Sequence, residues 1–157
     1  MPNHCHNRVT VYSANTHDVA KIKQMFEDEN CFGQIIPEPD WPNIPLSKHD
    51  SSNWLHPKRG EVGELPVKVE EYGTSYRFKS TDKADDRWYD WRLANWDTKW
   101  DAYDVVVTDD DPESVEIEFN TAWSPPEAIC HKIREDYPDV SVSWFYDEPG
   151  CEIAGYL

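Results

Sequence analysis

Residues 115–146, VEIEFNTAWSPPEAICHKIREDYPDVSVSWFY, carry the clearest pattern of secondary structure in this chain of 157 residues. Apolar and polar residues alternate strictly over 115–121, which is typical of a strand with one buried face. A helix is expected next, because Ser124 and Glu127 have the spacing of a capping box and proline suits the first helical position. Alternation returns over 140–146. The stretch therefore predicts a strand, a helix and a second strand.

The residues before this stretch predict a similar unit. Residues 7–12 alternate as a strand, residues 16–28 have apolar positions at helical spacing, and residues 103–108 form a further strand. An acidic turn over 109–113 leads into the strand at 115. The order strand, helix, strand, strand, helix, strand is that of the split βαβ, or ferredoxin-like, fold of the α+β class. Such an antiparallel sheet has helices on one face and leaves the other face bare. Residues 153–157 could add an edge strand.

A long segment separates the two halves of this pattern. Residues 30–65 contain many prolines and predict an irregular chain. Residues 67–80 alternate weakly, as in a small hairpin, and residues 84–95 have helical spacing. We therefore expect one domain over 1–157, with a Pro-rich insertion at about 30–83.

Charge narrows the range of functions. The chain has 15 Lys and Arg against 31 Asp and Glu, a balance of −16, and residues 97–157 hold −13 of it. Direct nucleic-acid binding and adsorption to an anionic membrane both need basic surfaces. A negative field attracts a basic protein or a cation instead. No apolar run is long enough to span a bilayer, and the N-terminus lacks a signal-peptide pattern, so a cytoplasmic protein is expected.

The acidic residues around the third strand are the first candidate site. Glu116 and Glu118 share the polar face of that strand, and the preceding turn is almost wholly acidic. We expect seven residues to bind a basic protein surface: Asp104, Asp109, Asp110, Asp111, Glu113, Glu116 and Glu118. A sheet edge could also support a homodimer. The competing interpretation is that the acids only keep the protein soluble, in which case they should be scattered over the surface.

A tryptophan cluster is the second candidate site. Tryptophan is enriched in binding hot spots, and a charged pair lies between two of the tryptophans. The possible pocket consists of Trp96, Lys99, Trp100, Asp101 and Trp123. The alternative, which we favour, is that the tryptophans close the open end of the α/β sandwich and that the charged pair orients a turn.

Catalytic and metal-binding patterns are weak. His4 and His6 would share one face of a strand, but zinc needs three or four ligands. The acidic turn lacks the ligand spacing of an EF-hand loop. Cys130 and His131 are adjacent on a helix and so face different sides. The four cysteines are expected to be thiols, mostly buried. We expect no metal, no cofactor and no catalytic residues.

Several motifs resemble those of the Api92-like family of phage and plasmid proteins. The resemblance runs along the whole chain and is carried by Met1-Pro2-Asn3, Ile36-Pro37-Glu38-Pro39, Asn95-Trp96-Asp97-Thr98-Lys99-Trp100-Asp101-Ala102, Thr121-Ala122-Trp123-Ser124-Pro125-Pro126 and Tyr146-Asp147-Glu148-Pro149-Gly150. It implies a ferredoxin-like fold and a mobile-element context, but no reaction. The family pattern has Gly where Asp97 stands and often Trp where His4 stands. Asp tolerates left-handed backbone better than most residues, so the turn at 97 can survive.

The hypothesis from sequence is a non-enzymatic, acidic interaction protein of a phage or plasmid. It would bind a basic surface of a host or phage protein, in one version as an inhibitor that mimics nucleic acid. The alternative hypothesis is a small-molecule or nucleotide-processing enzyme, with its site at the tryptophan cluster. The third hypothesis is an accessory protein whose acidic residues only keep it soluble.

Overall fold

The computed structural model describes residues 3–40, 47–48, 66–68, 76–78 and 87–157. The backbone falls into two compact units, one formed by residues 1–37 and 95–157 and the other by residues 38–94. The first unit holds a five-stranded sheet, and the second holds a three-stranded sheet.

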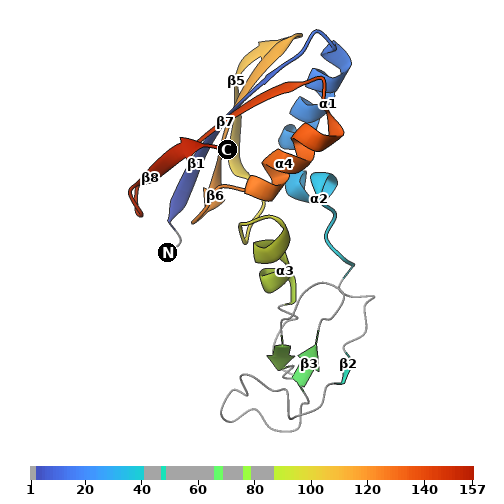
Figure 1. Cartoon of the computed structure of the whole chain (residues 1–157), viewed down its shortest axis with the longest axis vertical. Coiled ribbons are helices and arrows are strands. Elements are labelled where there is room, and N and C mark those ends of the chain that lie inside the picture. The colour runs from blue at the N-terminus through green and yellow to red at the C-terminus, as the bar shows by residue number, and fades with distance from the viewer. Residues whose placement is uncertain (1–2, 41–46, 49–65, 69–75, 79–86) are drawn as a thin grey trace. The chain divides into compact units, whose positions relative to one another are not determined.

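Five strands form the large sheet, in the order β5-β6-β1-β7-β8, and every neighbouring pair is antiparallel (Figure 1). The strands are β1 (His4–Tyr12), β5 (Tyr103–Asp111), β6 (Ser114–Ala122), β7 (Ser141–Glu148) and β8 (Ile153–Tyr156). The first four, with α1 (Thr16–Glu27) and α4 (Glu127–Asp136), follow the order of the split βαβ fold. The predicted fold class is confirmed, and β8 extends the sheet as an extra edge strand.

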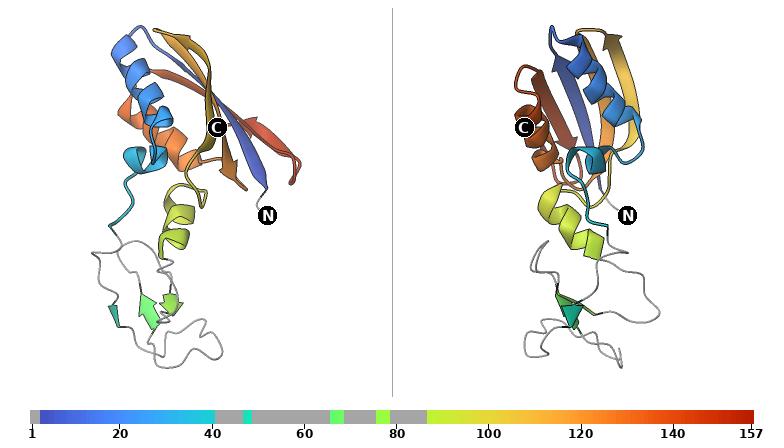
Figure 2. Two further views of the ribbon diagram at one scale, coloured as in Figure 1. Left: turned by 180° about the vertical axis from the view of Figure 1, so that it is seen from behind. Right: turned by 90° about the vertical axis from the view of Figure 1, so that its right-hand side faces the viewer.

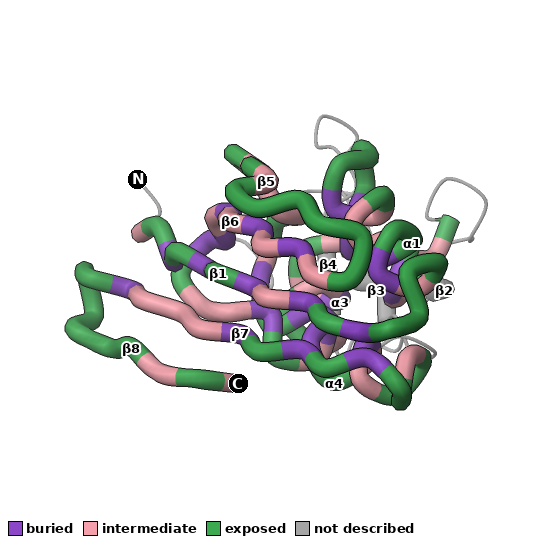
Figure 3. Tube along the Cα trace, turned by 90° about the horizontal axis from the view of Figure 1, so that it is seen from above, coloured by how far each residue is buried: buried purple, intermediate pink, exposed green. Residues whose placement is uncertain are grey.

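One face of this sheet is covered by helices and the other is bare (Figure 2). Burial alternates along β1 and β6, as Figure 3 shows. On the covered side Val9, Ile117, Trp144, Phe26 of α1 and Ile129 of α4 are all essentially inaccessible to solvent, and the centres of the Phe26 and Trp144 rings lie 6.1 Å apart. The bare side, which we name the open face, carries the alternate residues of each strand.

A short helix, α2 (Cys31–Ile35), follows α1. The prediction of an irregular segment is wrong at these residues. Cys31 and Phe32 are buried in the core, where the Phe32 ring meets the Trp96 ring edge to face at 5.8 Å. The rest of the predicted irregular segment lies largely outside the described residues.

Two further expectations need correction. The strand β5 continues through Asp109–Asp111, which pair with Ser114–Glu116, so the turn is confined to the two residues between the strands. The helix α4 does not have the predicted capping box of Ser124 and Glu127. Its N-cap is Pro126, which makes no side-chain hydrogen bond to the helix. The Asp97 side chain, from a distant loop, accepts a hydrogen bond from the first turn of α4 instead.

The unit of residues 38–94 contains β2 (Ser47–Lys48), β3 (Pro66–Lys68), β4 (Tyr76–Phe78) and most of α3 (Arg87–Asn95). β3 pairs antiparallel with β4, as the predicted hairpin requires, although its turn lies outside the described residues. Arg92 of α3 binds the Glu38 carboxylate, with Nη2 2.7 Å from Oε2, and its guanidinium lies 5.0 Å from the centre of the Trp88 ring.

Candidate functional site

The open face consists of alternate residues of five strands. The register between neighbouring strands determines which of these side chains lie next to one another. Arg8 of β1 lies between Glu118 of β6 and Phe145 of β7. His6 lies between Asn120 and Asp147 in the same way. Opposed residues on one face of an antiparallel pair have their Cβ atoms about 4.5–5.5 Å apart, so these side chains are direct neighbours.

The seven acidic residues predicted to bind a partner do not all share this face. Glu116 and Glu118 do, and Asp109 joins them because it pairs with Glu116. Asp104 also joins them, through its bond to Asn120. Asp110 pairs with the buried Val115 and therefore turns toward the helices.

Irregularities in β5 explain this division. The register shifts between Tyr103 and Val106 and again between Val107 and Asp109. Asp104, within the first irregularity, has a left-handed backbone with φ of 53°. At each shift β5 contains one residue more than the facing part of β6, and that extra residue changes which of the following side chains point to the open face. Bulges and charges also protect an edge strand against pairing with another chain.

Several of these carboxylates have partners within the chain. Glu118 Oε1 lies 3.0 Å from Arg8 Nε, and Asp110 Oδ2 lies 2.6 Å from Lys23 Nζ. The hydrogen bond from Lys23 to Asp110 raises the pKa of the lysine. Asp111 accepts from the backbone of Glu113 and so shapes the turn. Part of the negative charge is thus neutralised locally, and Asp109 is exposed at the hairpin end.

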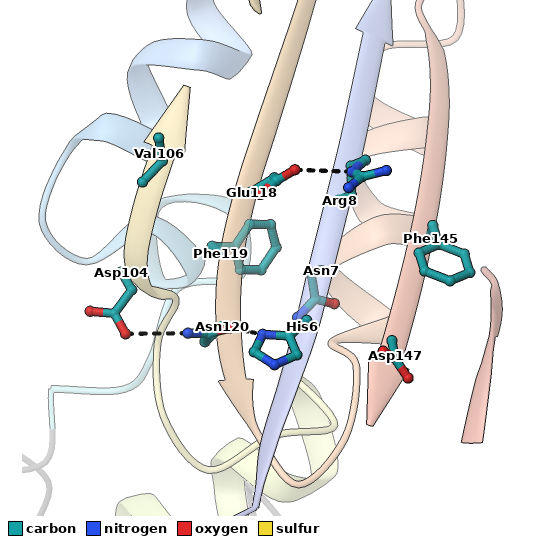
Figure 4. Close-up of a pocket in the computed structure, with 10 residues that line it drawn as sticks. All are labelled: His6, Asn7, Arg8, Asp104, Val106, Glu118, Phe119, Asn120, Phe145 and Asp147. Carbon is teal, nitrogen blue, oxygen red and sulfur yellow. Dashed lines mark hydrogen bonds and ion pairs between the residues drawn. The ribbon is translucent and has the colours of Figure 1, made fainter. Parts of the chain in front are cut away.

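A hollow of about 420 Å³ lies on the open face across β5, β6, β1 and β7 (Figure 4). A chain of hydrogen bonds crosses it. Asn120 donates through Nδ2 to the Asp104 carboxylate at 3.2 Å, and His6 Nδ1 lies 2.6 Å from Asn120 Oδ1. Because Oδ1 can only accept, His6 donates through Nδ1. In the neutral ring Nε2 is then an acceptor.

Charge in the hollow is unevenly balanced. Asp104, Glu118 and Asp147 line it, against the single guanidinium of Arg8. Arg8 is paired with Glu118. In the part of the chain that the structure describes, no hydrogen bond or ion pair engages the Asp147 carboxylate. The lining of the hollow therefore carries a net negative charge.

Large apolar side chains are also exposed on the open face. Tyr12 is 54% exposed, Val106 is 55% exposed and Tyr156 is 74% exposed. The Tyr156 ring meets the Phe145 ring at 5.2 Å, which places an aromatic pair on β7 and β8. Val106 and Tyr156 lie on strands at opposite edges of the sheet, so the exposed apolar side chains flank the charged residues of β6 and β1. Aromatic side chains are enriched at protein-binding surfaces.

The tryptophan cluster has a different arrangement. Trp96 is fully buried, and its Nε1 donates to the carbonyl of Ile36, the C-cap of α2, at 3.0 Å. Trp100 and Trp123 are 37% and 47% exposed, and Lys99 Nζ lies 4.5 Å from the centre of the Trp100 ring. Tryptophan favours such cation–π contacts.

Asp101 and Asp97 of this loop cap two helices. Asp101 Oδ1 accepts from the Phe32 amide in the first turn of α2 at 2.9 Å. Asp97 Oδ2 accepts from the Ala128 amide in the first turn of α4 at 2.9 Å. Asp97 has φ of 63°, the left-handed backbone expected at this position, and its carbonyl accepts from Ser124 Oγ. These contacts join segments of the fold, and the hypothesis of an enzyme site here stays a prediction.

The described residues contain no group of three or more His, Cys, Asp or Glu side chains that could hold a metal ion. His4 and His6 are both exposed on one face of β1, and His4 Nδ1 lies 2.6 Å from the Tyr103 hydroxyl. Cys5, Cys31 and Cys130 are buried free thiols, and Cys151 is exposed. Burial raises the pKa of Cys5 and of Cys130 to about 11. The described part of the chain has no helix long and apolar enough to cross a membrane.

Sequence reasoning missed His6, Asn120, Phe145 and Asp147 as members of one hollow. Asn120 and Phe145 lie on predicted strands, and His6 and Asp147 lie one residue beyond the predicted ends of two strands. Alternation shows only which residues of one strand share a face. The register that brings His6 beside Asn120 and Asp147 joins residues 114 and 141 positions apart. No local pattern contains that information.

Comparison with known proteins supports the fold. Residues 93–157 match the family model of the ferredoxin-like domain in Api92-like proteins, which is 65 of the 157 residues. The crystal structure of protein Api92 from Yersinia pseudotuberculosis is similar, with a TM-score of 0.52 and 11% sequence identity over 99% of this chain and 93% of that chain. A search of curated proteins found no match. At 11% identity the match to protein Api92 shows that the two chains have the same overall fold.

Proposed function

We propose that this chain is a non-enzymatic interaction protein that binds a basic surface of another protein through its open face. The observation that carries the proposal is the composition of that face. Exposed Tyr12, Val106 and Tyr156 lie among the carboxylates of β5, β6 and β7. Aromatic side chains are enriched at protein–protein interfaces, where charged residues surround them.

Net charge supports a basic partner. The unit of residues 1–37 and 95–157 has 20 Asp and Glu against 6 Lys and Arg, a balance of −14. Complementary charge accelerates encounter and rejects partners of the same sign. Nucleic acid and anionic membranes would be repelled by this unit.

The proposal extends to the setting of the protein. An origin in a phage or plasmid and a site of action in the host cytoplasm are part of the proposal, and they rest on the sequence motifs that resemble those of the Api92-like family. A phage protein with carboxylates along a sheet could occupy a groove that normally binds DNA or RNA phosphates. The partner would then be a basic host or phage protein, and the bound chain would inhibit it by mimicking nucleic acid.

A capture experiment with charge-matched variants tests this function. The tagged protein is incubated with lysate, washed at low salt and eluted at high salt, which screens charge pairs. One variant neutralises five acids of β5 and β6 that lie on the open face: Asp104→Asn, Asp109→Asn, Asp111→Asn, Glu116→Gln and Glu118→Gln. The control neutralises five exposed acids elsewhere: Glu29→Gln, Glu127→Gln, Glu135→Gln, Asp139→Asn and Glu152→Gln. Circular dichroism establishes that both variants fold.

The two variants have the same net charge, so they separate a specific site from general acidity. We expect the β5 and β6 variant to lose a salt-eluted basic protein that the control retains. Purified nucleic acid should displace that protein from the wild-type chain if the mimic version holds. Equal capture by wild type and both variants would contradict the proposal. Equal loss of the captured protein from both variants would mean that capture depends on net charge and not on the open face, which would also contradict the proposal.

A further inference from the structure

The hollow on the open face has the chemistry of a site for one positively charged side chain. We propose that it binds the guanidinium group of an arginine on the partner. The inference rests on the proposed function and adds to it the residue that the partner contributes. The geometry of the hollow, rather than the overall charge, carries the argument.

Acceptors line the hollow on several strands, and two of them are direct neighbours. Asp147 of β7 lies opposite His6 of β1, while Asp104 lies on β5, three strands from β7 (Figure 4). Neighbouring strands are about 4.8 Å apart, so Asp147 and His6 can contact one guanidinium, and Asp104 adds negative charge at a greater distance. Asp104 is held in place by Asn120, and the bond from His6 to the same amide leaves Nε2 as an acceptor. A guanidinium has five N–H donors in a fixed plane and no acceptor, which suits a set of separated acceptors.

The chain's own cation is engaged elsewhere in the hollow. Arg8 Nε lies 3.0 Å from Glu118 Oε1. This pair leaves the Asp147 carboxylate for a ligand. An incoming cation therefore meets Asp147 without displacing an internal ion pair, and Asp104 adds to the negative field around it.

Apolar walls favour arginine over other cations. Phe145 and Val106 line the hollow on opposite sides. A guanidinium is weakly hydrated and stacks on aromatic faces, whereas an ammonium is a compact and strongly hydrated charge. A metal ion would need three or more ligands at one point, and the described residues contain no such group.

A titration followed by nuclear magnetic resonance tests the site. The probe is N-acetyl-arginine amide, and the neutral control is N-acetyl-citrulline amide, which has nearly the same shape. We expect saturable shifts at His6, Asn120 and Phe145 with the arginine probe and none with citrulline. Asp147→Asn should weaken binding about three- to fivefold, as for loss of one partly exposed charge pair. Asp139→Asn removes an exposed acid elsewhere and should leave the affinity unchanged.

The outcomes separate this inference from the proposed function. Equal shifts with citrulline, equal affinity of Asp147→Asn and Asp139→Asn, or no saturable shift with arginine would each overturn the arginine site. The function would survive any of these results if the β5 and β6 variant still loses the captured protein. Stronger binding of N-acetyl-lysine amide than of the arginine probe would also overturn the inference, because the site would then select charge without shape.

Discussion

Asp101 Oδ1 lies 2.9 Å from the amide nitrogen of Phe32, a residue 69 positions earlier in the chain. Phe32 belongs to the first turn of α2, whose opposite end accepts the indole hydrogen of Trp96 at the Ile36 carbonyl. One loop thus satisfies backbone groups at both ends of a five-residue helix. Isolated helices of that length are not stable in water, so α2 depends on these distant partners.

Replacing Asp101 by alanine removes the acceptor at the start of α2. We expect Asp101→Ala to lower the free energy of unfolding by about 1–2 kcal/mol, the usual cost of a lost helix cap. Urea denaturation followed by tryptophan fluorescence measures the change. Asp139→Ala, at an exposed position, should cost less than about 0.5 kcal/mol. An equal effect of both substitutions would show that the Asp101 carboxylate does not support α2.

Asp97 combines a strained backbone with a useful side chain. Its φ of 63° favours glycine, but its carboxylate caps α4 at Ala128. We expect Asp97→Ala to be the least stable variant, because it loses the cap and keeps the strain. Asp97→Gly loses the cap but relieves the strain, and should fall between wild type and Asp97→Ala. Relative to wild type, alanine should cost about 1 kcal/mol for the lost cap, because the backbone strain is present in both chains, whereas glycine recovers up to about 1 kcal/mol by relieving it. Thermal unfolding gives the order, and alanine more stable than glycine would contradict it.

Alkaline pH should destabilise the fold through its buried acids. Cys5 and Cys130 have pKa values raised from 9.0 to about 11 by burial, and burial raises the pKa of Tyr103 as well. The folded state therefore holds these protons more tightly than the unfolded state. Their contribution to stability is complete below about pH 9 and is lost as pH rises toward about 11.

Urea denaturation at a series of pH values measures this dependence. We expect the free energy of unfolding to fall between pH 9 and about 11. Cys130→Ala should make the decline shallower, whatever it does to the stability at neutral pH. A decline that is as steep in the variant as in the wild type would show that Cys130 does not contribute.

The fold was predictable because its signals are local. Alternation over residues 115–121 and 140–146 and the helical spacing of Val19, Ile22 and Phe26 indicate the strands, the first helix and their order. Two of the three errors, α2 and the cap of α4, share a cause. Both elements are completed by the loop of Asp97 and Asp101, far away in sequence, so no local pattern could reveal them.

The candidate sites were predictable only in part. The strand pattern of β6 is enough to place Glu116 and Glu118 on the bare face. The irregularities of β5 rearrange the acids before β6, so that Asp110 faces α1 and binds Lys23. The hollow depends on register between β1, β6 and β7, which turns and long-range packing decide.

Substitution of Arg8 should accelerate association with a basic partner. The Arg8 guanidinium neutralises Glu118 on the open face. Arg8→Gln removes that positive charge and makes the face more negative, while Glu118→Gln makes it less negative. If the face attracts a basic protein, the first variant should associate faster than wild type and the second more slowly. Both effects should shrink at high salt, because exposed charges are then screened.

Surface plasmon resonance with the captured basic protein measures these rates. The pair is exposed, so each substitution should change the free energy of unfolding by less than about 1 kcal/mol. Lys132→Gln, on α4, provides the control, because it also removes one positive charge but lies on a helix that covers the opposite side of the sheet. Acceleration by Arg8→Gln alone would place the docking surface on the open face. Equal acceleration by Arg8→Gln and Lys132→Gln would mean that association depends only on net charge. That result would contradict the proposal that the open face is the binding site.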